Sequence, residues 1–185
     1  MQRLSDAGIQ VFAERGYHAA RVDDIVRAAH TSHGTFYLYF ANKEDLLRAL
    51  TVDCAEALFQ LSNSLDVIDG QLDFSRLRGF LTEFLAIYRR YGVVIRAWME
   101  GQVADRKVAR LGVKAFTRIA ARLAERIEES GAAQAVDATA SVSALMAMLE
   151  RFNYAVSSRN LDLDDDVTMD TLTLIVQRGF FGATV

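Results

Sequence analysis

Residues 22–40 read VDDIVRAAHTSHGTFYLYF, and this stretch decides the fold of the first part of the chain. Its apolar residues recur at three- and four-residue steps on both sides of the polar segment His30-Thr31-Ser32, which predicts two short helices. Because the connection between them is so short, the helices are expected to cross steeply rather than lie antiparallel. The stretch therefore predicts a helix-turn-helix, the arrangement that presents the start of its second helix to the major groove of DNA.

The second of these helices has one buried face and one outward face. Phe36 and Phe40 are four residues apart, so they share a face and are expected in the core. The candidate contact positions are Ser32, His33, Gly34, Thr35, Tyr37, Leu38 and Tyr39. Small and hydrogen-bonding residues suit close approach to a duplex, and a tyrosine ring can lie on a sugar or a thymine methyl group. Lys43 begins the next helix, where its charge adds to unpaired backbone N–H groups and predicts a phosphate contact.

The remainder of the chain shows the same helical periodicity. Gly92 is expected to separate an apolar stripe at 77–88 from a second one at 94–99, and further stripes follow at 108–127, 142–156 and 172–179. No run alternates with a period of two residues. The fold predicted is all-α, with about nine helices.

Composition supports this fold and limits the function. The 185 residues include no proline, as suits a chain of helices, and 51% are hydrophobic and 24% charged, as in globular proteins. The net charge of −3 gives no general sign of nucleic-acid binding. The charged start predicts no signal peptide, no stretch is apolar enough for a membrane span, and the single cysteine fits a reducing compartment. We therefore expect a cytoplasmic protein.

Three segments together resemble the N-terminal domain of TetR/AcrR-type transcriptional repressors. They are FAERGY at 12–17, VDDI at 22–25 and GTFYLYFANKEDLL at 34–47. The resemblance implies a helix-turn-helix DNA-binding domain at residues 1–45 and a helical ligand-binding and dimerisation domain at residues 46–185. It also implies a homodimer that binds a pseudo-palindromic operator and is released by a small-molecule inducer.

The resemblance assigns roles to the residues of the helix-turn-helix. Thr35, Tyr37 and Lys43 would contact the DNA backbone, and Ser32, His33 and Gly34 would lie nearest the base edges. Two positions depart from the family pattern. His30 stands where the family has a glycine, so His30 must adopt a left-handed conformation or the turn must differ. Arg21 replaces a threonine before Val22, which removes a helix cap and adds a cation that would support DNA binding.

The second part of the chain carries large, adaptable side chains that predict an apolar cavity between helices. The expected ligand-binding residues are Phe84, Trp98, Met99, Phe116, Met146, Leu149, Phe152 and Asn153. Asn153 lies on a buried stripe, where its amide needs either a neighbouring helix or a ligand as partner. Segments 145–154 and 170–182 resemble the ethionamide-resistance repressor subgroup, which implies an elongated lipophilic inducer.

The last helix carries a stripe that, with the helix at 146–156, predicts a four-helix dimer seam. Its members are Leu172, Ile175, Val176 and Gly179.

Several other features have competing interpretations. His30 and His33 are three residues apart, but no third metal ligand has suitable spacing, so we expect no metal and no other cofactor. Cys54 is expected as inert core rather than as a redox sensor, and the acidic segment 162–166 as a solvated connection rather than a calcium loop. No catalytic set is apparent, so we expect no enzyme; a helical enzyme and a protein–protein adaptor without DNA binding are the alternatives.

Overall fold

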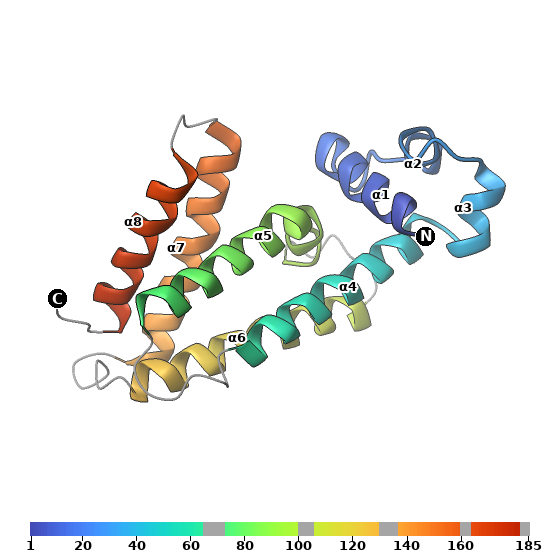
Figure 1. The fold of residues 1–185 in the computed structure, drawn as a ribbon. Helices are drawn as coiled ribbons and strands as arrows, with labels where there is room; N and C mark the ends of the chain where they lie inside the picture. The colour runs from blue at the N-terminus through green and yellow to red at the C-terminus, as the bar shows by residue number, and fades with distance from the viewer. Residues whose placement is uncertain (65–72, 100–105, 130–136, 160–163, 182–185) are drawn as a thin grey trace. The chain divides into compact units, whose positions relative to one another are not determined.

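All regular structure in the described part of the chain is α-helical, as predicted. The computed structural model describes residues 1–64, 73–99, 106–129, 137–159 and 164–181 (Figure 1). Within these ranges the helices are α1 (Gln2–Arg15), α2 (Val22–Ala28), α3 (His33–Tyr39), α4 (Lys43–Ser64), α5 (Phe74–Met99), α6 (Arg106–Glu129), α7 (Ala138–Arg159) and α8 (Asp165–Phe180). None of them combines the length and the apolar character that a membrane-crossing helix requires.

The described ranges hold eight helices, against the nine or so expected, because α5 continues through Gly92. A glycine inside a helix costs about 1 kcal/mol relative to alanine, which packing on both sides can offset. Here the apolar residues on both sides of Gly92 are buried: Tyr88 and Tyr91 before it, and Val94 and Ile95 after it. The apolar stripe therefore holds the helix together across the glycine, and the break expected at this position was wrong.

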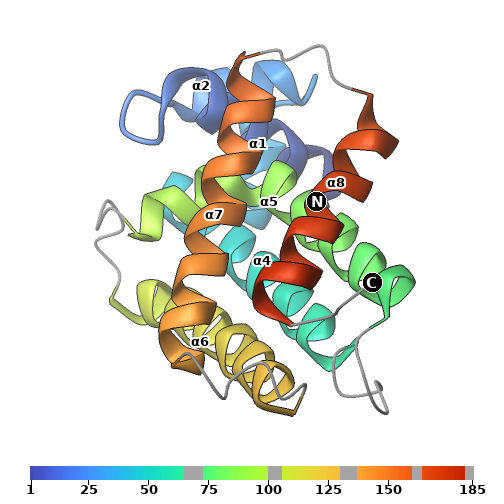
Figure 2. The same ribbon diagram turned by 90° about the vertical axis from the view of Figure 1, so that its left-hand side faces the viewer.

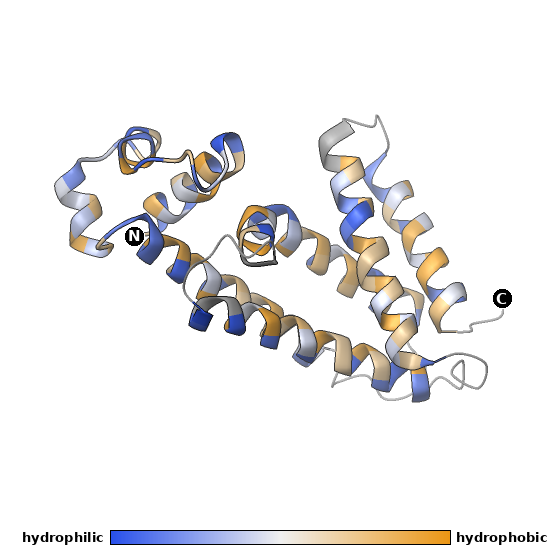
Figure 3. Cartoon of the chain, turned by 180° about the vertical axis from the view of Figure 1, so that it is seen from behind, coloured by the Kyte–Doolittle hydropathy of each residue, from blue (hydrophilic) through white to orange (hydrophobic). Residues whose placement is uncertain are grey.

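The chain divides into two compact units. One comprises Met1–Glu56 with Arg90–Lys114, and the other comprises Ala57–Arg89 with Ala115–Val185. Helices α4, α5 and α6 each contribute residues to both units. Hydrophobic and hydrophilic residues share the individual helices (Figure 3), as expected of amphipathic helices that bury one face.

Helices α1, α2 and α3 enclose a small aromatic and aliphatic core in the first unit. Phe12, Ile25 and Phe36 are almost completely buried there. Gly16 ends α1 with φ 75°, as its position in the sequence predicted, and its N–H donates to the Phe12 carbonyl. Arg3 on α1 donates to the Ala29 carbonyl at the end of α2 over 2.9 Å, which ties the two helices together.

The turn between α2 and α3 is a Schellman motif built on a histidine. His30 has φ 49°, in the left-handed region, as the missing glycine required. Its N–H donates to the Arg27 carbonyl (3.1 Å), and the Thr31 N–H donates to the Val26 carbonyl (2.9 Å). Ser32 then caps α3, because its hydroxyl oxygen accepts the Thr35 N–H over 3.1 Å. These hydrogen bonds set the angle at which the chain enters α3.

In the second unit α7 and α8 lie side by side (Figures 1 and 2). Asp164 caps α8 by accepting the Val167 N–H over 2.9 Å. Arg78 on α5 joins this end of α8 to α5, because its guanidinium donates to Asp166 (2.7 Å) and to Asp170 (2.5 Å). The acidic segment expected as a solvated connection therefore includes, within its described residues, the cap and first turn of α8.

Replacing His30 with glycine is expected to stabilise the protein. The left-handed conformation costs a residue with a Cβ about 1–2 kcal/mol, whereas glycine loses about 0.5–1 kcal/mol of unfolded-chain entropy. The His30→Gly protein should therefore unfold at a temperature higher by a few degrees in a calorimetric scan. His30→Ala is the control and should bring no gain, since alanine keeps the Cβ; equal gains from both substitutions would contradict the explanation.

Candidate functional site

Helix α3 presents a broad polar and aromatic surface to solvent. Phe36 and Phe40 are buried at 0% and 5% exposure, which confirms their predicted place in the core. Tyr37, Leu38 and Tyr39 are exposed at 57%, 76% and 47%. Three large side chains exposed on one turn of helix form an apolar patch of the kind that marks interaction surfaces. This turn is therefore a candidate contact surface.

The ring of Tyr37 is held in place from beneath. It packs edge-on against the buried Phe36 ring, with centroids 5.5 Å apart and planes at 87°. The side chain is thus both exposed and oriented, which lowers the entropy lost when it meets a partner.

Small residues with exposed surfaces form the N-terminal end of α3. The Ser32 and Thr35 hydroxyls lie 3.0 Å apart and share one hydrogen bond. A Cβ on Gly34 would meet only the Ser32 hydroxyl, at an ordinary 3.6 Å, and Gly34 is exposed. Neither the space around it nor its backbone conformation requires glycine at this position.

His33 joins α3 to α2. Its Nε2 atom lies 2.5 Å from the Asp23 carboxylate oxygen, and both side chains are more than half exposed. This pairing fixes the imidazole at the edge of the exposed surface. Among the described residues no group of three His, Cys, Asp or Glu side chains is arranged to hold a metal ion.

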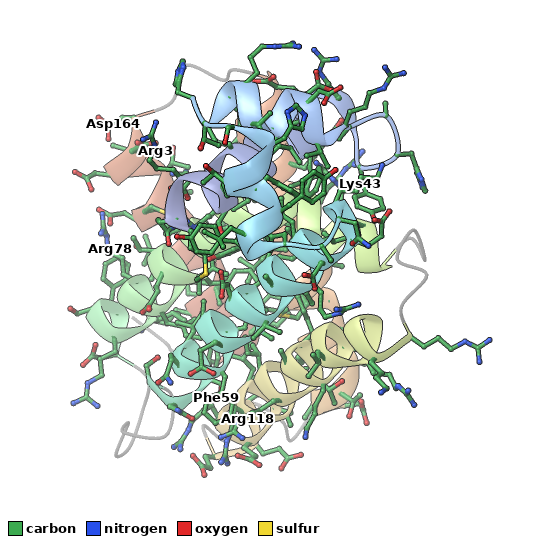
Figure 4. The ribbon with its side chains drawn as sticks, turned by 90° about the vertical axis from the view of Figure 1, so that its right-hand side faces the viewer. Arg3, Lys43, Phe59, Arg78, Arg118 and Asp164 are labelled. Atoms are coloured by element: carbon green, nitrogen blue, oxygen red, sulfur yellow. The ribbon has the colours of Figure 1, made fainter. Side chains whose placement is uncertain are left out.

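Lys43 has a role within the protein that its sequence position did not reveal. Its ammonium group donates to the carbonyls of Tyr17 (3.0 Å), His18 (3.0 Å) and Ala20 (3.1 Å), so all three of its protons are used. The same nitrogen lies 4.9 Å from the centroid of the Tyr17 ring. Lys43 (labelled in Figure 4) therefore fastens the α1–α2 connection to the start of α4, whereas the sequence had led us to expect a contact with DNA phosphate, which the structure does not test.

Tyr17 completes this junction from the other side. Burial raises the pKa of Tyr17 to about 12, and the charge and hydrogen bond of Glu44 in the first turn of α4 act in the same direction. The phenol is therefore neutral at physiological pH and its ring remains a fixed packing surface.

Arg21 stands before α2 with its side chain exposed. The cap lost with the missing threonine is replaced in part by Asp24, whose carboxylate accepts the Arg21 N–H over 3.3 Å. Asp24 also pairs with Arg15 (3.5 Å) and Arg27 (3.6 Å). No such partner is found for the Arg21 guanidinium among the described residues, so its charge is directed to solvent.

A second candidate site lies between α6 and α7, within the second compact unit. It is an open cavity of about 460 Å³, and it contains two of the predicted ligand-binding residues, Phe116 and Met146. The other lining residues are small or carry hydroxyl groups, apart from one valine: Thr117, Ala120, Ala121, Ala124, Thr139, Val142 and Ser143. Sequence reasoning favoured large side chains and so missed this set, although its three- and four-residue spacing on each helix was a usable signal.

The other predicted ligand-binding residues have different surroundings. Phe84 and Leu149 are buried at 1% and 0% exposure, and Phe84 stacks with Phe80 at 6.3 Å between centroids. Phe152 is half-buried, and Asn153 is buried with no amide hydrogen bond found among the described residues. The side chains of Trp98 and Met99 lie outside the described part of the structure.

The predicted dimerisation stripe on α8 divides between two faces. Leu172 and Val176 are buried within the protomer, whereas Ile175 is 52% exposed and Gly179 is exposed as well. The exposed apolar side chains that sequence reasoning missed on this pair of helices are Tyr154, Val167 and Leu174.

Cys54 is a core residue. It is completely buried, and burial raises its pKa to about 12, with the charge of Asp53 adding to the shift. A thiol with so high a pKa is not a nucleophile at neutral pH.

Comparison with known proteins supports the resemblance seen in the sequence. Residues 4–50 match the family described as bacterial regulatory proteins, tetR family. The uncharacterized HTH-type transcriptional regulator YvdT of Bacillus subtilis (strain 168) is 42% identical over 71 residues, which are 38% of this chain and 34% of that protein. The fatty acid metabolism regulator protein of the same organism is 48% identical over 48 residues, 26% of this chain and 25% of that protein.

The chain thus spans about a quarter to a third of the length of these two curated relatives. Among solved structures, the transcriptional regulator FadR from Bacillus subtilis in complex with stearoyl-CoA covers 99% of both chains, with a TM-score of 0.67 and 15% identity. The resemblance to TetR/AcrR-type regulators is confirmed over the segment that the tetR family model matches, residues 4–50, and the whole chain shares the fold of the solved FadR structure.

Replacing Lys43 with methionine is expected to destabilise the protein. Methionine keeps most of the apolar stem but leaves three carbonyls without their charged donor, a loss of about 1.5–3 kcal/mol. Urea denaturation should show this decrease in the free energy of unfolding. Arg21→Met, which removes an exposed charge nearby, is the control and should change it by less than about 0.5 kcal/mol; similar effects of the two substitutions would show that the three carbonyls do not depend on Lys43.

Proposed function

We propose that this protein is a transcriptional repressor of the cytoplasm that binds a pseudo-palindromic DNA operator as a homodimer and is released by a small lipophilic ligand. The observation that carries the proposal is the division of α3 into a buried face, Phe36 and Phe40, and an exposed face centred on Tyr37. The match of residues 4–50 to the tetR family supports it. So does the absence of any structural need for glycine at position 34.

In this proposal α3 enters the major groove with its leading end towards the bases. Ser32, His33 and Gly34 lie nearest the base edges, and Thr35 and Tyr37 contact sugar and phosphate. Leu38 and Tyr39 extend the surface along the groove. Arg21 contributes a phosphate contact from the start of α2, whereas Lys43 acts through the loop that it fastens.

To bind both half-sites of an operator, the protein must present two N-terminal domains, here called heads, in a symmetric dimer. The exposed residues Val167, Leu174 and Ile175 on α8 and Tyr154 on α7 offer an apolar surface for a four-helix seam. Gly179 lets two backbones approach closely at the same face. The seam would hold two recognition helices about 34–36 Å apart, one helical repeat of DNA.

A ligand would act by favouring a separation of the heads that does not fit DNA. Such coupling is about 1–3 kcal/mol in known systems, equivalent to a 5- to 150-fold loss of operator affinity. A lipophilic ligand is favoured by the apolar cavity between α6 and α7. It is also favoured by the fold shared with FadR, which binds stearoyl-CoA in its solved structure, and by the sequence match to a fatty acid metabolism regulator.

Selection from a pool of random duplexes tests the proposal without knowledge of the operator. The expected product is a site with two symmetry-related half-sites centred about 10–10.5 base pairs apart. Tyr37→Ala should weaken binding to the selected site at least tenfold while lowering the unfolding temperature by no more than a few degrees, since Tyr37 is 57% exposed and packs only edge-on against Phe36. Arg76→Ala, an exposed charge on α5, is the control. Failure to enrich any duplex would overturn the proposal.

The salt dependence of binding separates phosphate contacts from residues that act indirectly. Loss of one phosphate contact in each protomer lowers the slope of log K against log salt by about 1.8, since each contact contributes about 0.9. Arg21→Ala is expected to show this decrease, whereas Lys43→Met should lower affinity with the slope unchanged. A decrease of the slope with Lys43→Met would instead assign Lys43 to the DNA phosphates.

A further inference from the structure

His33 and Asp23 form a pair that crosses the turn of the helix-turn-helix. Asp23 lies in the first turn of α2, and His33 is the first residue of α3. The Nε2 atom of His33 lies 2.5 Å from a carboxylate oxygen of Asp23. No other side-chain partner of either residue is found in the described part of the chain. Within that part, each of the two side chains is held only by the other.

The neighbouring acid, Asp24, has a different role. Its side chain is 11% exposed, and it pairs with Arg15 and Arg27. The side chains of Asp23 and His33 are 64% and 54% exposed, and an ion pair so exposed adds little to the stability of a fold. Asp24 therefore fastens α2, whereas the effect of Asp23 falls on the His33 ring.

The contact with Asp23 decides which ring nitrogen of His33 carries the proton. An ionised carboxylate only accepts hydrogen bonds, so the Nε2 atom must be the donor and must carry a hydrogen. In a neutral imidazole the other nitrogen, Nδ1, then has no hydrogen and is an acceptor. No partner of Nδ1 is found among the described residues. His33 thus offers a hydrogen-bond acceptor of fixed identity at the exposed surface of α3.

The same contact restricts the orientation of the ring. An exposed histidine side chain without a partner would rotate about its two side-chain torsions. The bond to Asp23 removes that freedom, which lowers the entropy lost when the ring meets a partner. The Schellman turn at His30 and the Ser32 cap in turn fix the two helices that carry the pair. Both the position of Nδ1 and its acceptor character are therefore set before any partner binds.

We propose that Asp23 is a positioning residue that makes His33 recognise a base with an amino group on its major-groove edge, adenine or cytosine. The inference rests on the proposed function, because it requires α3 to lie in the groove. Adenine N6 and cytosine N4 carry the hydrogens that an acceptor needs, whereas guanine and thymine present only acceptors and a methyl group on that edge. Since every base pair contains one base of each kind, Nδ1 distinguishes which strand carries the amino base. A ring with its proton on Nδ1 would make the opposite choice.

The position of the proton is measured on the full-length protein without DNA. Nitrogen-15 NMR spectra distinguish a protonated from an unprotonated ring nitrogen, and His33→Gln identifies the His33 signals among those of the three histidines. At about pH 8.5, where a histidine side chain is ordinarily neutral, we expect hydrogen on Nε2 only. Asp23→Ala should move both nitrogen signals towards averaged values, because the two tautomers then exchange. Glu14→Ala removes another exposed carboxylate of the same unit and is the control, which should leave the signals unchanged.

The base preference is measured at the same pH on the duplex selected from the random pool, with one base pair of one half-site exchanged at a time. The position recognised by His33 is the one at which His33→Ala removes discrimination. There the unmodified protein should prefer adenine or cytosine about 2- to 10-fold, the contribution of one hydrogen bond. Asp23→Ala should reduce the preference to less than about twofold, and Asp23→Glu, which keeps the carboxylate, should restore part of it. Because the preference is a ratio of affinities, the general gain from removing a negative charge cancels.

A double-mutant cycle shows whether Asp23 acts through His33 or touches DNA itself. In the first case Asp23→Ala should have no further effect on base preference in the His33→Ala protein. An effect of the same size with and without His33 would place Asp23 on the DNA and would overturn the proposal. The unfolding temperature of the Asp23→Ala protein should fall by no more than a few degrees, so a lost preference does not reflect a damaged fold.

The remaining outcomes separate this proposal from the proposed function. Unchanged ring nitrogens in the Asp23→Ala protein, or a preference for guanine or thymine at the His33 position, would overturn the assignment while DNA binding itself stands. Failure of the proposed function would give a different result, with no duplex selected although the NMR spectra still show the proton held on Nε2 by Asp23. That result would overturn the role in base recognition and support only the pairing of the two side chains.

Discussion

The burial of Phe36 fixes the orientation of α3, and the exposed surface of the N-terminal unit depends on it. Helix α3 is only seven residues long, so one completely buried ring determines which way every other side chain points. The Schellman turn at His30 and the Ser32 cap bring α3 to this ring at a set angle. Lys43 then fastens the connection that precedes α2. A rotation of α3 about its axis would expose Phe36 to water, at a cost of about 1.5–3 kcal/mol.

Local sequence signals predicted the elements of this unit well, because the interactions that form them are local. Gly16 at the end of α1, Ser32 at the start of α3 and the left-handed His30 each depend on hydrogen bonds within a few residues. The burial of Phe36 and Phe40 followed from their spacing alone. The break expected at Gly92 was wrong because it was inferred from a single glycine. Helix α5 is kept continuous by the packing of its buried side chains against other segments of the chain, which the glycine alone does not reveal.

The parts that sequence reasoning missed depend on contacts between distant segments. Lys43 donates hydrogen bonds to carbonyls 23 to 26 residues earlier in the chain. The spacing of residues in the sequence does not reveal such a contact. On α8 the apolar residues occupy two faces, and the sequence does not state which face meets the neighbouring helix; Val176 turned inward and Ile175 outward. The cavity between α6 and α7 was also missed, because it forms where small side chains on two different helices face each other, and the sequence does not show which residues face each other.

The open position at Gly34 bears on how proteins of this kind diverge. A Cβ added there would meet only the Ser32 hydroxyl, at an ordinary contact distance, so the fold places little restriction on which residue stands at this end of the helix. Under the proposed function, substitutions at this site in a duplicated copy of the gene would be filtered by the DNA sequence to be recognised and hardly at all by the requirement to fold. Such uncoupling lets a lineage acquire new regulatory targets in single mutational steps, without first accumulating compensatory changes elsewhere.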